Sequence, residues 1–167
     1  MWTPSPFFRH SERVRRGWID YNGHMHEAYY VLVFGNATDA LYDRLGMGRA
    51  YREKRQFSNY TLESHVNFLK EVGVKVPLRV TTQVLAADDK CMQIFHAMYS
   101  GETRDMLATT EVMVLHVDTS GDEVRAEPFP RDVAERLEGV MEEHSQIPKP
   151  TYAGRVIAMR RPPANQP

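Results

Sequence analysis

Apolar side chains recur at the spacing of an α-helix from Glu27 to Leu45. They form a wide stripe around the predicted helix, which indicates that it is buried along most of its length. Gly46 suits the C-terminal end of such a helix, where a left-handed backbone is common. Glu27 in the first turn and Arg44 in the last turn carry the charges that the two ends of a helix dipole favour.

Strand character dominates on both sides of this helix. Residues 8–19 predict a first strand, which the polar cluster 20–24 ends, because Asp, Asn and Gly favour turns. Four later segments are rich in Val, Thr, Phe and Tyr and are separated by Gly, Pro and Asp. These segments are 57–71, 78–88, 92–100 and 106–118. Short turns between consecutive strands predict an antiparallel meander. Further helices are expected at 47–55 and at 130–144, where Pro130 suits the first turn.

The element order predicts an α+β fold, with one long central helix wrapped by a five-stranded antiparallel sheet. One helix does not cover both faces of such a sheet, so a second subunit is expected against the remaining face. A single domain spans 9–144. An N-terminal arm with two prolines precedes it at 1–8, and a proline-rich tail, extended or disordered, follows at 145–167.

Composition narrows the classes of protein to consider. The chain has 167 residues, 42% hydrophobic and 26% charged, which fits one globular domain. Its net charge of −1 gives no reason to expect nucleic acid or an anionic membrane as partner. No apolar run approaches the roughly 18 residues of a membrane span, and no secretory signal is recognisable. A single cysteine, Cys91, allows no intrachain disulfide, so we expect a cytoplasmic protein.

The turn that precedes the long helix concentrates polar side chains within 20–27. A helix N-terminus offers unpaired N–H groups and a positive dipole end, which stabilise an oxyanion. The Asp20 carboxylate beside it suits a nucleophile or a general base, and Gly23 lets a substrate approach the backbone. Alternatively, Asp20 or Asn22 simply caps the helix, and local chemistry alone favours this structural role.

A metal site in this turn is not expected. His24, His26 and Glu27 are possible ligands, but their spacing matches none of the usual zinc patterns. The lone Cys91 adds no further ligand pair. Substrate contacts or hydrogen bonds within the loop are therefore the expected roles of these side chains.

A second group of polar residues lies on the strand that follows the long helix. Alternation places Glu63, His65 and Asn67 on one side of it. They form either a solvated face, which periodicity alone favours, or one wall of a cleft at a subunit interface. Cys91 and His96 fall on opposite faces of another strand, which argues against a cysteine nucleophile. Phosphate-binding loops and serine-hydrolase elbows are absent from the sequence.

The pattern Asp20-x-x-Gly23-His24-Met25, followed by Ala28-x-Tyr30, resembles the signature of 4-hydroxybenzoyl-CoA-type hotdog thioesterases. The likeness in element order covers about residues 9–118. It implies the hotdog fold, with dimers or larger assemblies that hold active sites between subunits. It also implies that Asp20 is the catalytic carboxylate, and that CoA enters only as part of an acyl-CoA substrate, without a separate cofactor.

Two departures from the family pattern affect the expected site. Trp18 stands where relatives have a first Asp, which leaves the catalytic carboxylate in place. Glu27 stands where relatives often have Asn or His at the helix entry. This difference leaves the stabilisation of the oxyanion open and makes Glu27 a second acid–base candidate.

A closer resemblance is to the thioesterases of carnitine breakdown, which hydrolyse betainyl-CoA and are sometimes fused to carnitine dehydrogenase. The segments that carry it are 20–25, 34–41, 60–65 and 115–118. A quaternary ammonium substrate suits an aromatic cage, each good contact contributing about 0.5–2 kcal/mol, with Glu63 as counter-charge. The candidate rings are Trp18, Tyr21, Tyr29, Tyr30, Phe34 and Tyr60.

The expected function is hydrolysis of an acyl-CoA thioester by a homodimer or homotetramer. Asp20, Glu63 and His24 are the expected catalytic residues. The expected substrate-binding residues are Trp18, Tyr21, Asn22, Gly23, His26, Glu27, Tyr60 and His65. One alternative is a hotdog enoyl-CoA hydratase or dehydratase, although Gly23 and Met25 depart from the proline and histidine of that motif. The other is an acyl-CoA-binding module without catalytic activity.

Overall fold

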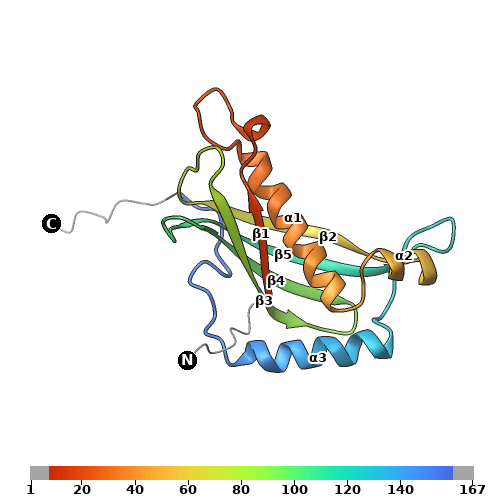
Figure 1. Cartoon of the computed structure of the whole chain (residues 1–167). Helices are drawn as coiled ribbons and strands as arrows, with labels where there is room; N and C mark the ends of the chain where they lie inside the picture. Colours follow the sequence, from red (N-terminus) through yellow and green to blue (C-terminus); the bar gives the residue numbers. More distant parts are fainter. Residues whose placement is uncertain (1–7, 160–167) are drawn as a thin grey trace.

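The computed structural model describes residues 8–159 and has one long helix lying against the concave side of a curled antiparallel sheet (Figure 1). Helix α1 is Glu27–Arg44. The strands are β1 (Phe8–Arg13), β2 (Phe57–Phe68), β3 (Pro77–Ala87), β4 (Cys91–Ser100), β5 (Met106–Asp118) and the short β6 (Arg125–Ala126). The strand order is β1-β3-β4-β5-β2, with β6 paired to β5. The predicted α+β class, with a central helix and five main strands, is confirmed.

Three shorter elements complete the fold: a 3-10 turn η1 (Arg16–Trp18), helix α2 (Arg49–Arg55) and helix α3 (Arg131–Ser145). The predicted first strand was too long, because β1 ends at Arg13 and η1 follows before the turn that contains Asp20. The predicted strand 57–71 also ends early, at Phe68. In both cases the chain leaves the sheet edge to reach the N-terminal end of α1, which local periodicity does not encode.

The predicted arm at 1–8 lies outside the described residues except for Phe8, which begins β1. Within the predicted tail, Ser145 ends α3, and the chain then runs along the outer face of the sheet. The Gln83 side-chain amide donates to the Ile147 carbonyl over 3.4 Å. Further along, the Gly154 N–H donates to the Glu111 carboxylate over 2.5 Å. These contacts place the described part of the tail against β3, β4 and β5.

Two hydrophobic clusters surround α1. The cluster at its N-terminal half includes Tyr30 and Phe34, which pack against Leu78 of β3 and Ala108 of β5. The cluster at its C-terminal half includes residues of α2 and α3. The Arg136 side chain of α3 donates to the Leu45 carbonyl over 2.8 Å at the end of α1. Gly46 follows with a φ of 73°, the left-handed conformation that the sequence predicted there.

Alternation along β2 follows the predicted faces. Phe68 lies opposite Ala108 and His65 lies opposite Glu111 in the antiparallel pairing with β5. Because directly opposite residues share a face, Phe68 lies on the helix side and His65 on the outer side. A bulge between Thr61 and Glu63 interrupts this register.

Three histidines are fully buried in the fold, His96, His116 and His144. His96 lies between the hydroxyls of Thr38 and Thr82, each 2.9 Å from a ring nitrogen. His116 lies 2.7 Å from the Tyr51 hydroxyl and 2.6 Å from the Glu127 carbonyl. Burial lowers the pKa of His96 to about 3 and also lowers the pKa of His116, since the interior disfavours the charged ring.

We therefore predict that the free energy of unfolding falls as the pH drops below about 6.5. There the unfolded chain binds protons on histidines that the folded chain keeps neutral, so acidification favours unfolding. For His96 the loss between pH 7.5 and 5 is about 2 kcal/mol. Urea titrations at the two pH values measure it. A His96→Gln variant should lose less stability on acidification than the wild type, and an unchanged loss would contradict the assignment.

Candidate active site

Asp20 begins a tight turn directly before α1. The Asp20 N–H donates to the His24 carbonyl over 2.9 Å, and the Gly23 N–H donates to the Asp20 carbonyl over 3.0 Å. Gly23 has a φ of 85°, which favours glycine because a Cβ strains this conformation. The Asp20 carboxylate accepts one hydrogen bond, 2.8 Å long, from the Asn22 N–H and is partly exposed. The turn therefore holds the carboxylate in place while leaving acceptor capacity for a substrate or water.

His26, not Asp20 or Asn22, caps α1. Its Nδ1 accepts a hydrogen bond from the Ala28 N–H over 3.1 Å, and its backbone is extended as at other helix caps. The alternative in which Asp20 or Asn22 caps this helix is wrong, because their turn closes on itself before the helix begins. Asp20 is thus available for a role other than capping.

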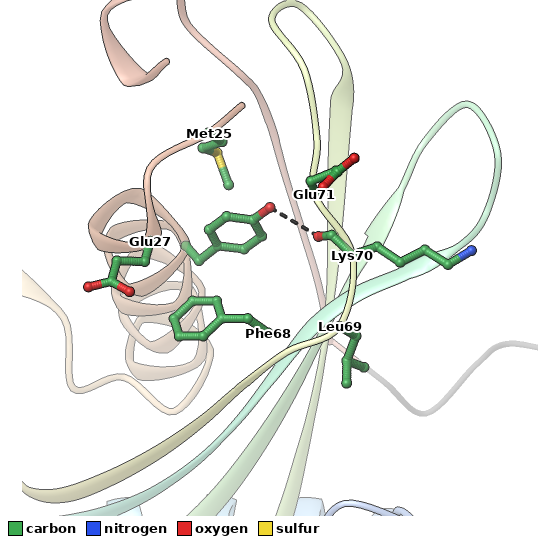
Figure 2. Close-up of a pocket in the computed structure, with 7 residues that line it drawn as sticks. Met25, Glu27, Phe68, Leu69, Lys70 and Glu71 are labelled. Carbon is green, nitrogen blue, oxygen red and sulfur yellow. Dashed lines mark hydrogen bonds between the residues drawn. The ribbon is translucent and has the colours of Figure 1, made fainter. Parts of the chain in front are cut away.

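Hydrogen bonds fix the turn against its surroundings. The Met25 N–H donates to the Val72 carbonyl over 2.8 Å, and the His26 N–H donates to the Trp18 carbonyl over 2.9 Å. The Tyr30 hydroxyl donates to the Lys70 carbonyl over 3.1 Å (Figure 2). The segment between β2 and β3, which contains Lys70 and Val72, therefore holds both the turn and the first turns of α1.

These hydrogen bonds also reduce the number of backbone N–H groups that remain available to stabilise an oxyanion. The N–H groups of Gly23, Met25 and His26 already donate hydrogen bonds to carbonyls within the protein. The N–H of Glu27, the first residue of α1, makes no hydrogen bond within the part of the chain that the structure describes, nor does that of His24. Glu27 N–H lies at the positive end of the α1 dipole, which suits it to stabilise a developing negative charge.

An open pocket of about 620 Å³ adjoins the turn. Figure 2 shows its walls, formed by the first turns of α1 and by the end of β2 and the segment after it. The lining residues are Met25, Glu27, Tyr30, Phe68, Leu69, Lys70 and Glu71. His24, four residues from Asp20, has its Nε2 3.6 Å from a Glu71 carboxylate oxygen. Asp20 does not line the pocket itself. Along the chain, His24 and Met25 lie between Asp20 and the lining residues of α1.

Several residues expected to bind substrate lie elsewhere in the chain. Trp18 is buried and stacks on Tyr29, with ring centroids 5.2 Å apart, and the Arg15 guanidinium lies 5.1 Å from the Trp18 ring. Phe34 stacks on His96 in the core. Tyr21 is 97% exposed on the turn that begins at Asp20. The six candidate rings therefore do not form one cage within the described chain.

Glu63 and His65 face a separate pocket of about 220 Å³ on the outer side of the sheet. Glu111 and Arg155 share that pocket with them. Tyr60, 45% exposed, lies on the same strand at the edge of the sheet. Within one chain the structure does not bring these three predicted residues into the pocket beside Asp20.

Sequence reasoning missed four lining residues, Phe68, Leu69, Lys70 and Glu71. All four fall inside the segment predicted as one strand, where nothing local distinguishes them. Their position depends on β2 ending beside the N-terminus of α1, which is a long-range feature of the sheet. The pKa of the Tyr30 hydroxyl is raised from its ordinary value. Burial is the larger cause, and the negative charge of Glu71 adds to it.

Residues 8–159 contain no group of three or more His, Cys, Asp or Glu placed to hold a metal ion. In the same range, no helix is long and apolar enough to cross a membrane.

We predict that the His26 side chain stabilises α1 through its cap. His26→Ala should lower the free energy of unfolding by about 1 kcal/mol, because the Ala28 N–H loses its acceptor. His26→Ser should retain most of that stability, since Ser is a favoured cap. Urea unfolding measures both variants. Equal stability of the alanine variant and the wild type would exclude the capping role, whereas a stable but inactive serine variant would assign His26 to substrate binding.

Comparison with known proteins places this geometry in a family. The family model described as the thioesterase-like superfamily matches residues 14–137. The betainyl-CoA thioesterase of Pseudomonas aeruginosa is 42% identical over 142 residues, which cover 85% of this chain and 88% of that protein.

Two solved structures share the fold closely. A Staphylococcus aureus protein solved in complex with CoA superposes with a TM-score of 0.84 at 26% identity, covering 92% of this chain and 96% of its own. A putative thioesterase from Pseudomonas putida gives a TM-score of 0.80 at 34% identity, covering 94% and 99%. The chain belongs to the thioesterase-like superfamily and has the hotdog fold that its sequence predicted.

Proposed function

We propose that the protein hydrolyses an acyl-CoA thioester, and betainyl-CoA in particular, to a free acid and CoA. The Asp20 carboxylate carries the proposal. It is fixed in a closed turn, has no cationic side chain bound to it among the described residues, and lies directly before a helix N-terminus. The betainyl-CoA thioesterase that is 42% identical to this chain supports the choice of acyl group.

Hydrolysis follows from Asp20 by either of two routes. As a nucleophile, the carboxylate attacks the thioester carbonyl, the C–S bond breaks, and water then hydrolyses the mixed anhydride. As a general base, it takes a proton from a water that attacks the carbonyl directly. In both routes the carbonyl oxygen becomes negative, and the Glu27 N–H at the α1 N-terminus is placed to stabilise it. The CoA thiolate leaves and takes up a proton.

His24 is the proposed residue for orienting the substrate or the attacking water. It follows Asp20 in the same turn, and Glu71 lies beside its ring. CoA is part of the substrate in this scheme, and the absence of any other cofactor stays a prediction, as does the cytoplasmic location.

We also propose that the working unit is at least a homodimer. Strand β2 has 12 residues and pairs only with β5 among the described strands, so one of its edges is open. Leu62 on this strand is 58% exposed. Long open edges of this kind are usually covered. Antiparallel pairing with a second β2 would place the Phe57 end of one strand beside the Phe68 end of the other. Tyr60 of one subunit would then lie near the pocket of its partner.

The catalytic assignment predicts that Asp20→Asn lowers kcat for acyl-CoA hydrolysis at least about 100-fold, because the amide neither attacks the thioester nor accepts the proton. The fold should be retained, since an amide oxygen can still accept the hydrogen bond from the Asn22 N–H. A thiol reagent measures CoA release, and thermal unfolding checks the fold.

Wild-type activity in the Asp20→Asn variant would show that another group performs the chemistry. A wild type that binds acyl-CoA but releases no thiol from betainyl, aromatic, short or long acyl chains would favour the acyl-binding module. An Asp20→Ala variant, which also removes the acceptor of the Asn22 N–H, separates loss of charge from loss of this hydrogen bond.

The proposed dimer predicts that a charged side chain introduced at the open edge of β2 weakens the assembly. Leu62→Lys should shift the assembly toward the 19.3 kDa monomer and lower activity, because an ammonium disfavours burial between two strands. Val124→Lys is the matched control, since Val124 is 49% exposed but lies in the loop before β6. Analytical ultracentrifugation measures both variants. A monomeric wild type, or equal behaviour of the two variants, would overturn the proposed interface.

A further inference from the structure

The pocket beside the catalytic turn contains two carboxylates from different elements. Glu27 comes from the first turn of α1, and Glu71 comes from the segment after β2 (Figure 2). Both side chains are exposed to the pocket or to solvent. Neither carboxylate forms an ion pair with a lysine or arginine in the described residues. The nearest basic group is the ring of His24, 3.6 Å from Glu71.

The one lysine in the lining directs its charge away from the pocket. The Lys70 ammonium lies 2.8 Å from the Asp105 carboxylate at the start of β5. Figure 2 shows the Lys70 side chain extending away from Glu27 and Phe68. Only the Lys70 carbonyl faces the pocket, where it accepts the Tyr30 hydrogen bond. The charged side chains of the lining that have no lysine or arginine partner among the described residues are therefore the two carboxylates, Glu27 and Glu71.

Aromatic rings form the pocket wall between the two carboxylates. Tyr30 and Phe68 meet edge to face, with centroids 5.5 Å apart. Tyr30 is 4% exposed and locked by its hydrogen bond, whereas Phe68 is 49% exposed. Aromatic surface combined with a carboxylate attracts a quaternary ammonium, which cannot donate a hydrogen bond and gains from ring faces and negative charge.

A neutral acyl group gains only the ring contacts from this arrangement, and an anionic acyl group loses from the negative charge. A helix N-terminus usually attracts anions, but Glu27 and Glu71 would repel an acyl carboxylate in a pocket of this polarity. The volume of about 620 Å³ also leaves ample room for a trimethylammonium group beside the thioester.

We propose that this pocket selects an acyl group bearing a fixed positive charge, with Glu71 as the main specificity residue, Glu27 as its second counter-charge, and Phe68 as the ring surface. This inference rests on the proposed hydrolysis. It assigns recognition of the acyl group to Glu71, Glu27 and Phe68 and not to Glu63. It also means that selectivity and catalysis are carried by different carboxylates, since Asp20 lies outside the pocket lining.

The test uses two substrates of the same shape. Betainyl-CoA carries a trimethylammonium group, and 3,3-dimethylbutanoyl-CoA carries a tert-butyl group in its place. Glu71→Gln should lower kcat/KM for betainyl-CoA about five- to tenfold, with a smaller loss for Glu27→Gln. For 3,3-dimethylbutanoyl-CoA, both variants should lower kcat/KM by a clearly smaller factor than for betainyl-CoA, because the tert-butyl group carries no charge for either carboxylate to attract. Glu71→Asp should recover part of the loss for the charged substrate.

Glu138→Gln is the matched control, because it removes one exposed carboxylate from α3, away from the pocket. It should leave both substrates unchanged, which excludes a general effect of net charge. Equal losses of Glu71→Gln on the two substrates would mean that Glu71 only supports the turn, and this would overturn the proposal. No loss on either substrate would overturn it as well.

A binding measurement separates this inference from the proposed hydrolysis. A ketone analogue of betainyl-CoA, with a methylene between sulfur and carbonyl, cannot release CoA. Calorimetry should show tighter binding of this analogue than of its tert-butyl counterpart, and Glu71→Gln should remove the difference. Such a preference without thiol release would retain the inference and refute the hydrolysis. Thiol release without any preference that depends on Glu71 would do the reverse.

Discussion

Helix α1 is covered by a sheet that curls around it, and this packing positions everything else in the molecule. Tyr30 and Phe34 on one half of the helix are buried against β3 and β5. The other half is buried with α2 and α3. Because one face of the helix packs against the sheet along its length, its N-terminus lies at a fixed place, between the turn that contains Asp20 and the segment that joins β2 to β3 (Figure 1).

That fixed N-terminus explains how a short turn can hold a reactive group. The turn has little core of its own, so hydrogen bonds to Val72 and Trp18 supply its rigidity. His26 completes the helix cap, which leaves the Asp20 carboxylate with one short contact to Asn22. The carboxylate is held in one position, and the Glu27 N–H has no acceptor within the described chain; the proposed hydrolysis uses both features.

Electrostatics divide the molecule into two acidic regions with different surroundings. Glu27 and Glu71 line the pocket on the helix side, where Lys70 is paired outward with Asp105. On the outer face, Glu111 is occupied by the Gly154 N–H and the Gln93 amide. Of these two regions, the first adjoins the turn that contains Asp20, and it is the one to which the proposed acyl recognition is assigned.

The sequence alone determined the long helix, the turn with Asp20 before it, and the alternation that separates Phe68 from His65, because these depend on neighbours within a few positions. It did not determine which residues share a pocket. Glu71 and Phe68 join Glu27 there through the order and curl of the strands, and the same long-range pairing decides that the face with Glu63 is the one turned away from the helix. Periodicity records the side of a strand on which a residue lies. Only the tertiary structure decides which end of that strand meets the helix.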